Sequence, residues 1–131
     1  MDCGGQQTKL KILNMNYSIL NQYGITFQKQ ANGNIKINAN SKILDNFMFM
    51  FCRDKQKLEK FILILSQVLN NGFNSISEQD KYWDIEIGLQ VYTGIIHNNT
   101  EFDLYFENEE NETYPLSDIR EIFSSLFEFI N

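Results

Sequence analysis

Residues 82–107, YWDIEIGLQVYTGIIHNNTEFDLYFE, decide the fold of this chain. In residues 82–96 the apolar side chains stand mainly at odd positions and the polar ones mainly at even positions. A period of two is typical of a β-strand with one buried face, and residues 101–107 show the same alternation. The sequence therefore predicts two long strands that pair as an antiparallel hairpin with one apolar and one polar face.

The register of this hairpin follows from the two alternations together. A two-residue turn at residues 98–99 opposes Ile95 to Phe102 and gathers the apolar side chains of both strands on one side. The same register opposes Tyr92 to Tyr105 on the other side. The polar face is therefore expected to combine carboxylates with tyrosines.

Such a face has two interpretations. Tyrosine is common at protein interfaces because it brings a large amphipathic ring at modest entropic cost, so the face is a candidate docking surface for a basic partner. The alternative is the solvated side of an ordinary antiparallel sheet. The candidate partner-binding residues are Asp84, Glu86, Tyr92, Glu101, Asp103, Tyr105, Glu107, Glu109 and Glu110.

Acidic residues concentrate toward the end of the chain. The net charge of the 131 residues is −6, and residues 101–131 hold nine acidic residues and one basic residue, against eight and ten in residues 1–100. Residues 107–112, ENEENE, are predicted to form an exposed loop. This balance argues against contact with a nucleic-acid backbone, which needs clustered Lys and Arg. It favours a basic protein partner or serves only to keep the protein in solution.

Three other segments have the apolar spacing of helices. The first covers residues 8–23, and the glycine that follows caps it. The second begins after Asp54 as N-cap and ends at residues 70–72. The third follows the only proline, with Ser117 as N-cap, and it is Phe-rich. An exposed edge of these Phe side chains is a candidate homodimer contact.

A second hairpin is predicted at residues 25–38, where apolar positions alternate around Asn32-Gly33. A two-residue turn would place the apolar residues of its strands on opposite faces. A three-residue turn with Gly33 in a bulge opposes Phe27 to Ile35 and unites the apolar residues, so we favour the bulged form.

The fold class follows from these elements and one apolar run. Residues 43–52 are apolar at odd and even positions, which fits a strand covered on both faces or a buried helix; we favour a central strand. The chain is therefore expected to be a single α+β domain over residues 8–131, after a disordered N-terminus at residues 1–7. Its order is α-β-β-β-α-β-β-α, with a mainly antiparallel sheet and helices packed on one face.

We expect no catalysis, no cofactor and no bound metal. The one histidine, His97, lies beside the predicted turn, and Cys3 and Cys52 match neither a disulfide framework nor a metal spacing. Gly4-Gly5 precedes any strand, so it is no phosphate loop. No run is long enough for a membrane helix and no signal-peptide pattern opens the chain, so the expected compartment is the cytoplasm.

The stretch EFDLYFE at residues 101–107, followed by YPLSDIR at residues 114–120 and an amphipathic helix, is similar to bacterial immunity proteins of contact-dependent growth inhibition and polymorphic toxin systems. The resemblance is one of type and covers the whole small, acidic, aromatic-rich chain. It implies that the protein binds and neutralises a cognate toxin, often a nuclease, through acidic residues and tyrosines. In such complexes carboxylates imitate nucleic-acid phosphates and speed the encounter.

Two alternatives stay open beside this resemblance. One is an inhibitor of a host or phage nuclease that acts by nucleic-acid mimicry. The other is a small-ligand-binding α+β domain with a deep apolar pocket lined by Phe side chains.

Overall fold

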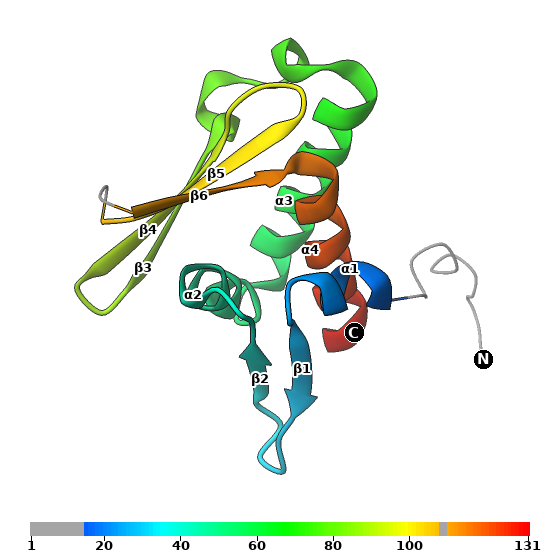
Figure 1. Cartoon of the computed structure of the whole chain (residues 1–131), viewed down its shortest axis with the longest axis vertical. Helices are drawn as coiled ribbons and strands as arrows, with labels where there is room; N and C mark the ends of the chain where they lie inside the picture. Colours follow the sequence, from blue (N-terminus) through cyan, green and yellow to red (C-terminus); the bar gives the residue numbers. More distant parts are fainter. Residues whose placement is uncertain (1–14, 108–109) are drawn as a thin grey trace.

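The computed structural model describes residues 15–107 and 110–131 (Figure 1). Its helices are α1 (Tyr17–Gln22), α2 (Lys42–Phe51), α3 (Lys55–Asn71) and α4 (Leu116–Ile130). Its strands are β1 (Thr26–Lys29), β2 (Ile35–Asn38), β3 (Tyr82–Ile87), β4 (Gln90–Ile96), β5 (Glu101–Phe106) and β6 (Glu110–Pro115). Two short 3-10 helices, η2 (Phe73–Ser75) and η3 (Glu78–Lys81), connect α3 to β3. The predicted disordered segment 1–7 and the first half of the predicted helix 8–23 lie outside the described residues.

The larger sheet is a four-stranded antiparallel meander in the order β3-β4-β5-β6, and β1 and β2 form a separate antiparallel pair. Helix α2 contacts β3, β4 and β5, and α4 contacts β5 and β6. In Figure 1 the β1-β2 hairpin points away from the larger sheet. The α+β class with a mainly antiparallel sheet is confirmed, but the observed order is α-β-β-α-α-β-β-β-β-α.

The predicted central strand at residues 43–52 is wrong, because this run forms helix α2. The Ser41 side chain caps the helix by accepting a hydrogen bond from the backbone N–H of Leu44 at 3.0 Å. Leu44, Phe47, Met48 and Phe51 are buried at spacings of three and four. The flanking apolar residues of the run are half-buried because helices and sheet surround α2, and this wide burial hid the helical period in the sequence.

Phenylalanine rings from three helices and one strand form the centre of the core. All five rings have no exposed surface, and their centroids lie 4.9–6.1 Å apart in the contacting pairs. Edge-to-face pairs at such distances add to the stabilisation that comes from burial. The rings belong to Phe47, Phe51, Phe61, Phe102 and Phe123. Phe side chains therefore fill the interior of the domain.

The β1-β2 hairpin has the predicted odd loop. Gln30 and Asn34 close a three-residue turn in which Gly33 has a φ of +87°. The predicted pairing is wrong by two residues, because Phe27 opposes Ile37, not Ile35. Side chains alternate between the two faces of a strand, so a shift of two residues in the pairing leaves each side chain on the same face. The apolar side chains of β1 and β2 therefore still share one face.

The predicted single strand at residues 82–96 is wrong, because it is two strands. Ile87 pairs with Gln90 across a two-residue turn at Gly88-Leu89. Gly88 has a φ of +63° and Leu89 is 99% exposed. A glycine at the first central position is typical of the type II′ turn that joins hairpin strands.

The predicted register of β4 with β5 is wrong by one residue. The loop between them has three residues, 98–100, and Ile96 opposes Phe102 where Ile95 was expected. A slip of one residue moves every side chain of a strand to the other face. Tyr92, Gly94 and Ile96 of β4 therefore face the helices.

The ends of the helices agree with the sequence in part. The Asp54 side chain caps α3 by accepting from the N–H of Lys57 at 3.1 Å, as predicted. Helix α4 begins at Leu116 with Pro115 at its N-cap, so the predicted cap at Ser117 is wrong. The predicted acidic loop at 107–112 is also wrong, because β6 begins within it.

Candidate functional site

The larger sheet has one face against the helices and one face turned away from them (Figure 1). Opposed residues in neighbouring strands have side chains on the same side, so the register assigns each residue to a face. We call the face turned away from the helices the outer sheet face. Its residues are Tyr82, Asp84, Glu86, Val91, Thr93, Ile95, Glu101, Asp103, Tyr105, Asn111 and Thr113.

The middle of this face is less polar than the sequence predicted. Val91, Thr93 and Ile95 of β4 lie on it and are half-buried by their neighbours. The one-residue slip puts them there, because the expected register assigned them to the core. We call these three residues the apolar strip, because Val91 and Ile95 are apolar and Thr93 between them has a methyl group as well as its hydroxyl. Carboxylates lie on the strands at either side.

Strand β3 supplies two exposed acidic groups of the face. Asp84 opposes Thr93 and Glu86 opposes Val91, and both acidic side chains are exposed. Tyr82, which opposes Ile95, is 51% exposed. The sequence analysis missed Tyr82 and the strip of β4. The isolated glycine at position 88 was the signal that β3 ends early.

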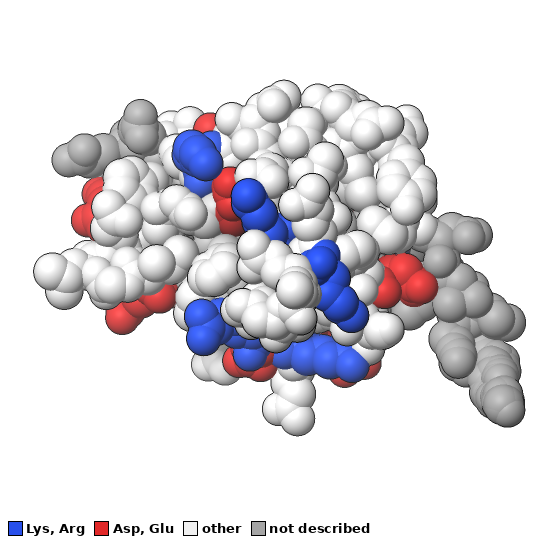
Figure 2. All heavy atoms as spheres, turned by 90° about the horizontal axis from the view of Figure 1, so that it is seen from below, with Lys and Arg blue, Asp and Glu red and all other residues white. Residues whose placement is uncertain are grey.

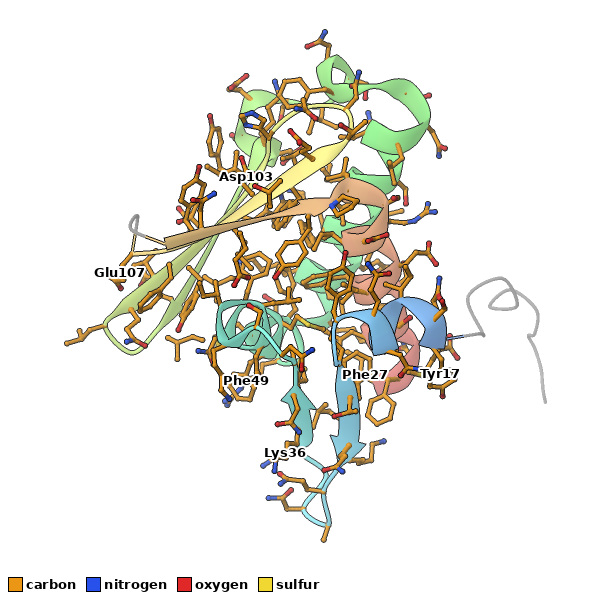
Figure 3. All side chains as sticks on the ribbon, in the orientation of Figure 1. Tyr17, Phe27, Lys36, Phe49, Asp103 and Glu107 are labelled. Atoms are coloured by element: carbon orange, nitrogen blue, oxygen red, sulfur yellow. The ribbon has the colours of Figure 1, made fainter. Side chains whose placement is uncertain are left out.

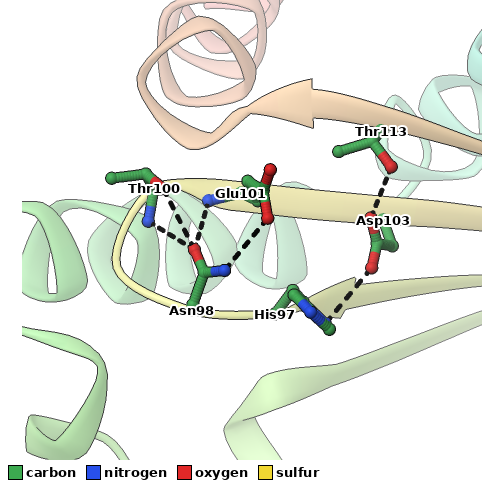
Figure 4. Close-up of polar contacts among 6 residues, drawn as sticks. All are labelled: His97, Asn98, Thr100, Glu101, Asp103 and Thr113. Atoms are coloured by element: carbon green, nitrogen blue, oxygen red, sulfur yellow. Dashed lines mark hydrogen bonds and ion pairs between the residues drawn. The ribbon is translucent and has the colours of Figure 1, made fainter.

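Asp103 occupies the middle of β5 and is only 8% exposed (Figure 3). Thr113 of β6 donates its hydroxyl to Asp103 Oδ1 at 2.7 Å, and His97 Nδ1 lies 3.3 Å from Oδ2 (Figure 4). The imidazole is 57% exposed. A carboxylate held by two partners and shielded by them mainly fixes the strands to one another.

Glu101 stands where the loop between β4 and β5 ends. Asn98 Oδ1 accepts hydrogen bonds from the backbone N–H groups of Thr100 at 2.8 Å and Glu101 at 2.9 Å (Figure 4). Asn98 Nδ2 donates to Glu101 Oε1 at 3.0 Å. The loop therefore holds the exposed Glu101 carboxylate beside the His97–Asp103 pair.

Glu107 directly follows β5 and has a φ of +56°. Its carboxylate accepts the backbone N–H of Val91 at 2.8 Å, and its own N–H donates to the Val91 carbonyl at 3.0 Å. The side chain therefore adds a hydrogen bond at the end of the β4-β5 ladder; Figure 3 labels Glu107. This carboxylate has a partner within the chain and is less available to another protein than that of Asp84.

The prediction that Tyr92 lies among the acidic residues is wrong. Tyr92 is 3% exposed, accepts a hydrogen bond from Asn46 Nδ2 at 2.8 Å and packs on Phe106 with ring centroids 4.9 Å apart. Its hydroxyl needs a partner when buried, and α2 supplies it. Glu110 is the first residue of β6, and Glu109 lies outside the described residues.

Electrostatics and shape define what this face can do. Its eleven residues include four carboxylates, two tyrosines and no Lys or Arg. Within residues 15–107 and 110–131, no three His, Cys, Asp or Glu side chains are grouped to hold a metal ion. The arrangement suits recognition of a cationic surface better than activation of a nucleophile.

Comparison of the chain with protein-family models, curated protein sequences and solved structures finds no match. None of the helices in the described part of the chain combines the length and apolar character that crossing a membrane requires.

Proposed function

We propose that this chain is an immunity-type inhibitor that binds a cognate bacterial toxin domain, of the nuclease class, through its outer sheet face. The observation that carries the proposal is the apolar strip Val91, Thr93 and Ile95 with carboxylates on both sides. Protein interfaces commonly have an apolar centre and a polar rim. An ordinary solvated sheet face needs neither the strip nor the excess of one charge.

The two parts of the face have different roles in this proposal. The strip on β4 is desolvated by the partner and contributes most of the affinity. The carboxylates of Asp84, Glu86 and Glu101 attract a basic surface and raise the association rate, an effect that weakens with salt. A nuclease domain offers such a surface because it binds nucleic-acid phosphates.

The structure changes the set of proposed contacts. Asp84, Glu86, Glu101 and Tyr105 remain, and Tyr82 joins them because it is exposed beside Ile95. Asp103 and Glu107 support the face through their internal hydrogen bonds. This role places the chain in the cytoplasm, where the toxin acts.

The experiment uses the product of the gene directly upstream of that for this chain as the candidate partner, and the proposal predicts that this product contains a toxin domain. Binding is measured by calorimetry at low and physiological salt, and growth is measured when both proteins are expressed together. Asp84→Lys with Glu86→Lys is expected to weaken binding at least about ten-fold at low salt and to abolish protection, because both charges become repulsive.

The matched control is Glu59→Lys with Glu128→Lys, the same charge change on α3 and α4. This control is expected to keep the dissociation constant within about two-fold of that of the native chain. Its charges lie away from the outer sheet face, and salt screens their long-range effect on the partner. Equal affinity of the β3 variant and the native chain would overturn the proposal. Equal weakening by both variants would reduce it to a net-charge effect and also contradict a defined face.

A further inference from the structure

A second surface lies at the other end of the molecule, between the tip of the β1-β2 hairpin and the last turn of α2. It is a cleft of about 560 Å³, a volume common among sites for small organic ligands. In Figure 3, Phe49 lies where α2 meets the hairpin. The hairpin wall includes Gln30, Asn34 and Ile35, and the helical wall includes Phe49, Cys52 and Arg53.

The cleft has an apolar part beside its polar walls. Ile35, Phe49 and Cys52 are half-buried and line it. Burial raises the pKa of the Cys52 thiol to about 11, so this group is neutral at physiological pH. An alkyl or aromatic body placed here covers apolar surface without meeting a charge.

Arg53 is the one charged residue among those that line the cleft. No ion pair between described residues involves it, and its guanidinium lies 5.9 Å from the centroid of the Phe49 ring. Such a position over a ring leaves the fork of N–H donors free to bind a carboxylate or phosphate in bidentate fashion.

The acceptors beside Arg53 already have partners. The carbonyls of Phe49, Met50 and Phe51 accept the backbone N–H groups of the residues three positions later, at 3.1–3.3 Å. The Asp54 carboxylate caps α3. The C-terminal end of the α2 dipole is negative and repels a bound anion. Its last carbonyls already accept hydrogen bonds, and this weakens the repulsion.

The surroundings of the cleft include several cationic side chains. Figure 2 looks onto this end of the molecule and shows several Lys and Arg side chains around the hairpin, with Asp and Glu side chains among them. Lys29 opposes Ile35 in the β1-β2 pair, so both side chains belong to the same hairpin face. Lys29 on this face of the hairpin and Arg53 in the cleft both favour a bound anion.

We propose that this cleft binds a small amphipathic anion, with a carboxylate or phosphate on Arg53 and an apolar body over Ile35 and Phe49. The side-chain amides of Gln30 and Asn34, which line the same wall, orient the anionic group. This site is separate from the outer sheet face and does not depend on the toxin-binding proposal.

The test is a titration of the full chain with three ligands that share one tail: octanoate, octyl phosphate and octanol. Binding is followed by two-dimensional ¹H–¹⁵N spectra. Both anions are expected to bind at least about ten-fold more tightly than octanol and to shift the resonances of Ile35, Phe49 and Arg53. The two anionic arms determine which head group the cleft prefers.

Arg53→Gln is expected to remove the preference of the cleft for anions while octanol binding is unchanged. Lys36→Gln is the matched control, because Lys36 lies next to Ile35 on the opposite side of β2 and should leave the preference intact. The proposal is overturned if octanol binds as well as the anions, if Arg53→Gln keeps the preference, or if the shifts map to the groove at Leu63 between α3 and α4.

Discussion

Gly94 is the position of β4 where the core leaves no room for a side chain. A Cβ atom there would lie 2.9 Å from Cζ of Phe47 and closer still to Cζ of Phe102. Both rings have no exposed surface and belong to the cluster of phenylalanines, so they cannot turn away. The absence of a side chain allows the sheet to approach α2 closely.

Gly94→Ala is therefore expected to lower the free energy of unfolding by about 2 kcal/mol, because the added methyl group overpacks the core. Urea unfolding measures it. Thr93→Ala, the neighbouring residue on the outer sheet face, is the control and should cost less than about 1 kcal/mol. The opposite order of the two effects would place residue 93, not residue 94, against the helices.

Tyr23 makes the stability of the fold sensitive to pH in the alkaline range. Its hydroxyl donates to Asp118 Oδ2 at 2.5 Å, which connects the end of α1 to the first turn of α4. Burial, then the hydrogen bond and charge of Asp118, raise the pKa of Tyr23 to about 12. Burial and a hydrogen bond to Glu112 also raise the pKa of Tyr114.

The free energy of unfolding is expected to fall as the pH rises from about 10 to about 12. In this range the unfolded chain has lost the phenolic proton, whose ordinary pKa is about 10, and the folded chain keeps it. The unfolded state then binds fewer protons, so its population grows with pH. Below pH 10 the contribution of Tyr23 is fully present.

Tyr23→Phe should reduce this slope in unfolding curves recorded at several pH values between about 9 and 11.5. Tyr17→Phe is the control, since Tyr17 is 64% exposed and, among the described residues, donates only to the sulfur of Met15. Identical slopes for the native chain and Tyr23→Phe would show that the Asp118 contact does not form.

At the scale of elements, the β3-β4 turn determines which side chains reach the outer sheet face. Gly88 has a φ of +63°, a conformation that costs an alanine about 1 kcal/mol. Gly88→Ala should destabilise the protein by roughly that amount in thermal unfolding. Leu89→Ala, at the adjacent and fully exposed position, should change it by less than about 0.5 kcal/mol. Equal losses would indicate a different turn.

The same turn explains why the sequence did not reveal which side chains of β4 lie on the outer sheet face. Ile85 and Ile87 of β3 and Val91 and Ile95 of β4 are all odd-numbered, so their alternation continues through position 88 as if the chain went straight. A two-residue turn reverses the face of odd positions, because residue 87 then opposes residue 90. The outward position of five side chains was predictable, because the alternation within β3 and within β5 assigns each residue to the correct face. They are Asp84, Glu86, Glu101, Asp103 and Tyr105. The buried position of Tyr92 was not predictable.

Helices were predictable where one stripe was apolar and the ends carried caps. Helix α3 has both, with Asp54 at its start and Gly72 at its end. The end of α1 was predictable as well, since the N–H of Gly24 bonds to Asn21 and that of Ile25 to Leu20. Helix α2 was not, because burial on several sides makes the apolar pattern of a helix resemble that of a central strand.

For the whole molecule, the two proposed binding surfaces differ in the charged groups that form them. The outer sheet face holds carboxylates beside an apolar strip, and the hairpin end holds Arg53 among further cations (Figure 2). The net charge of −6 describes neither end. Separate surfaces allow a basic protein and a small anion to bind without competing for the same residues.

The claim that the outer sheet face binds the partner is tested most directly by thiol labelling at Thr93→Cys. The background is Cys3→Ser; Cys52 can stay, because burial raises its thiol pKa to about 11 and slows its reaction near neutral pH. The labelling rate is measured with and without the toxin domain. Gln67→Cys, at an exposed position on α3, is the control.

We predict that the thiol at position 93 reacts readily in the free chain and at least about ten-fold more slowly in the complex, while the thiol at position 67 reacts at the same rate in both. A thiol at position 93 that resists labelling in the free chain would contradict the register. One that reacts equally fast in the complex would contradict the binding face.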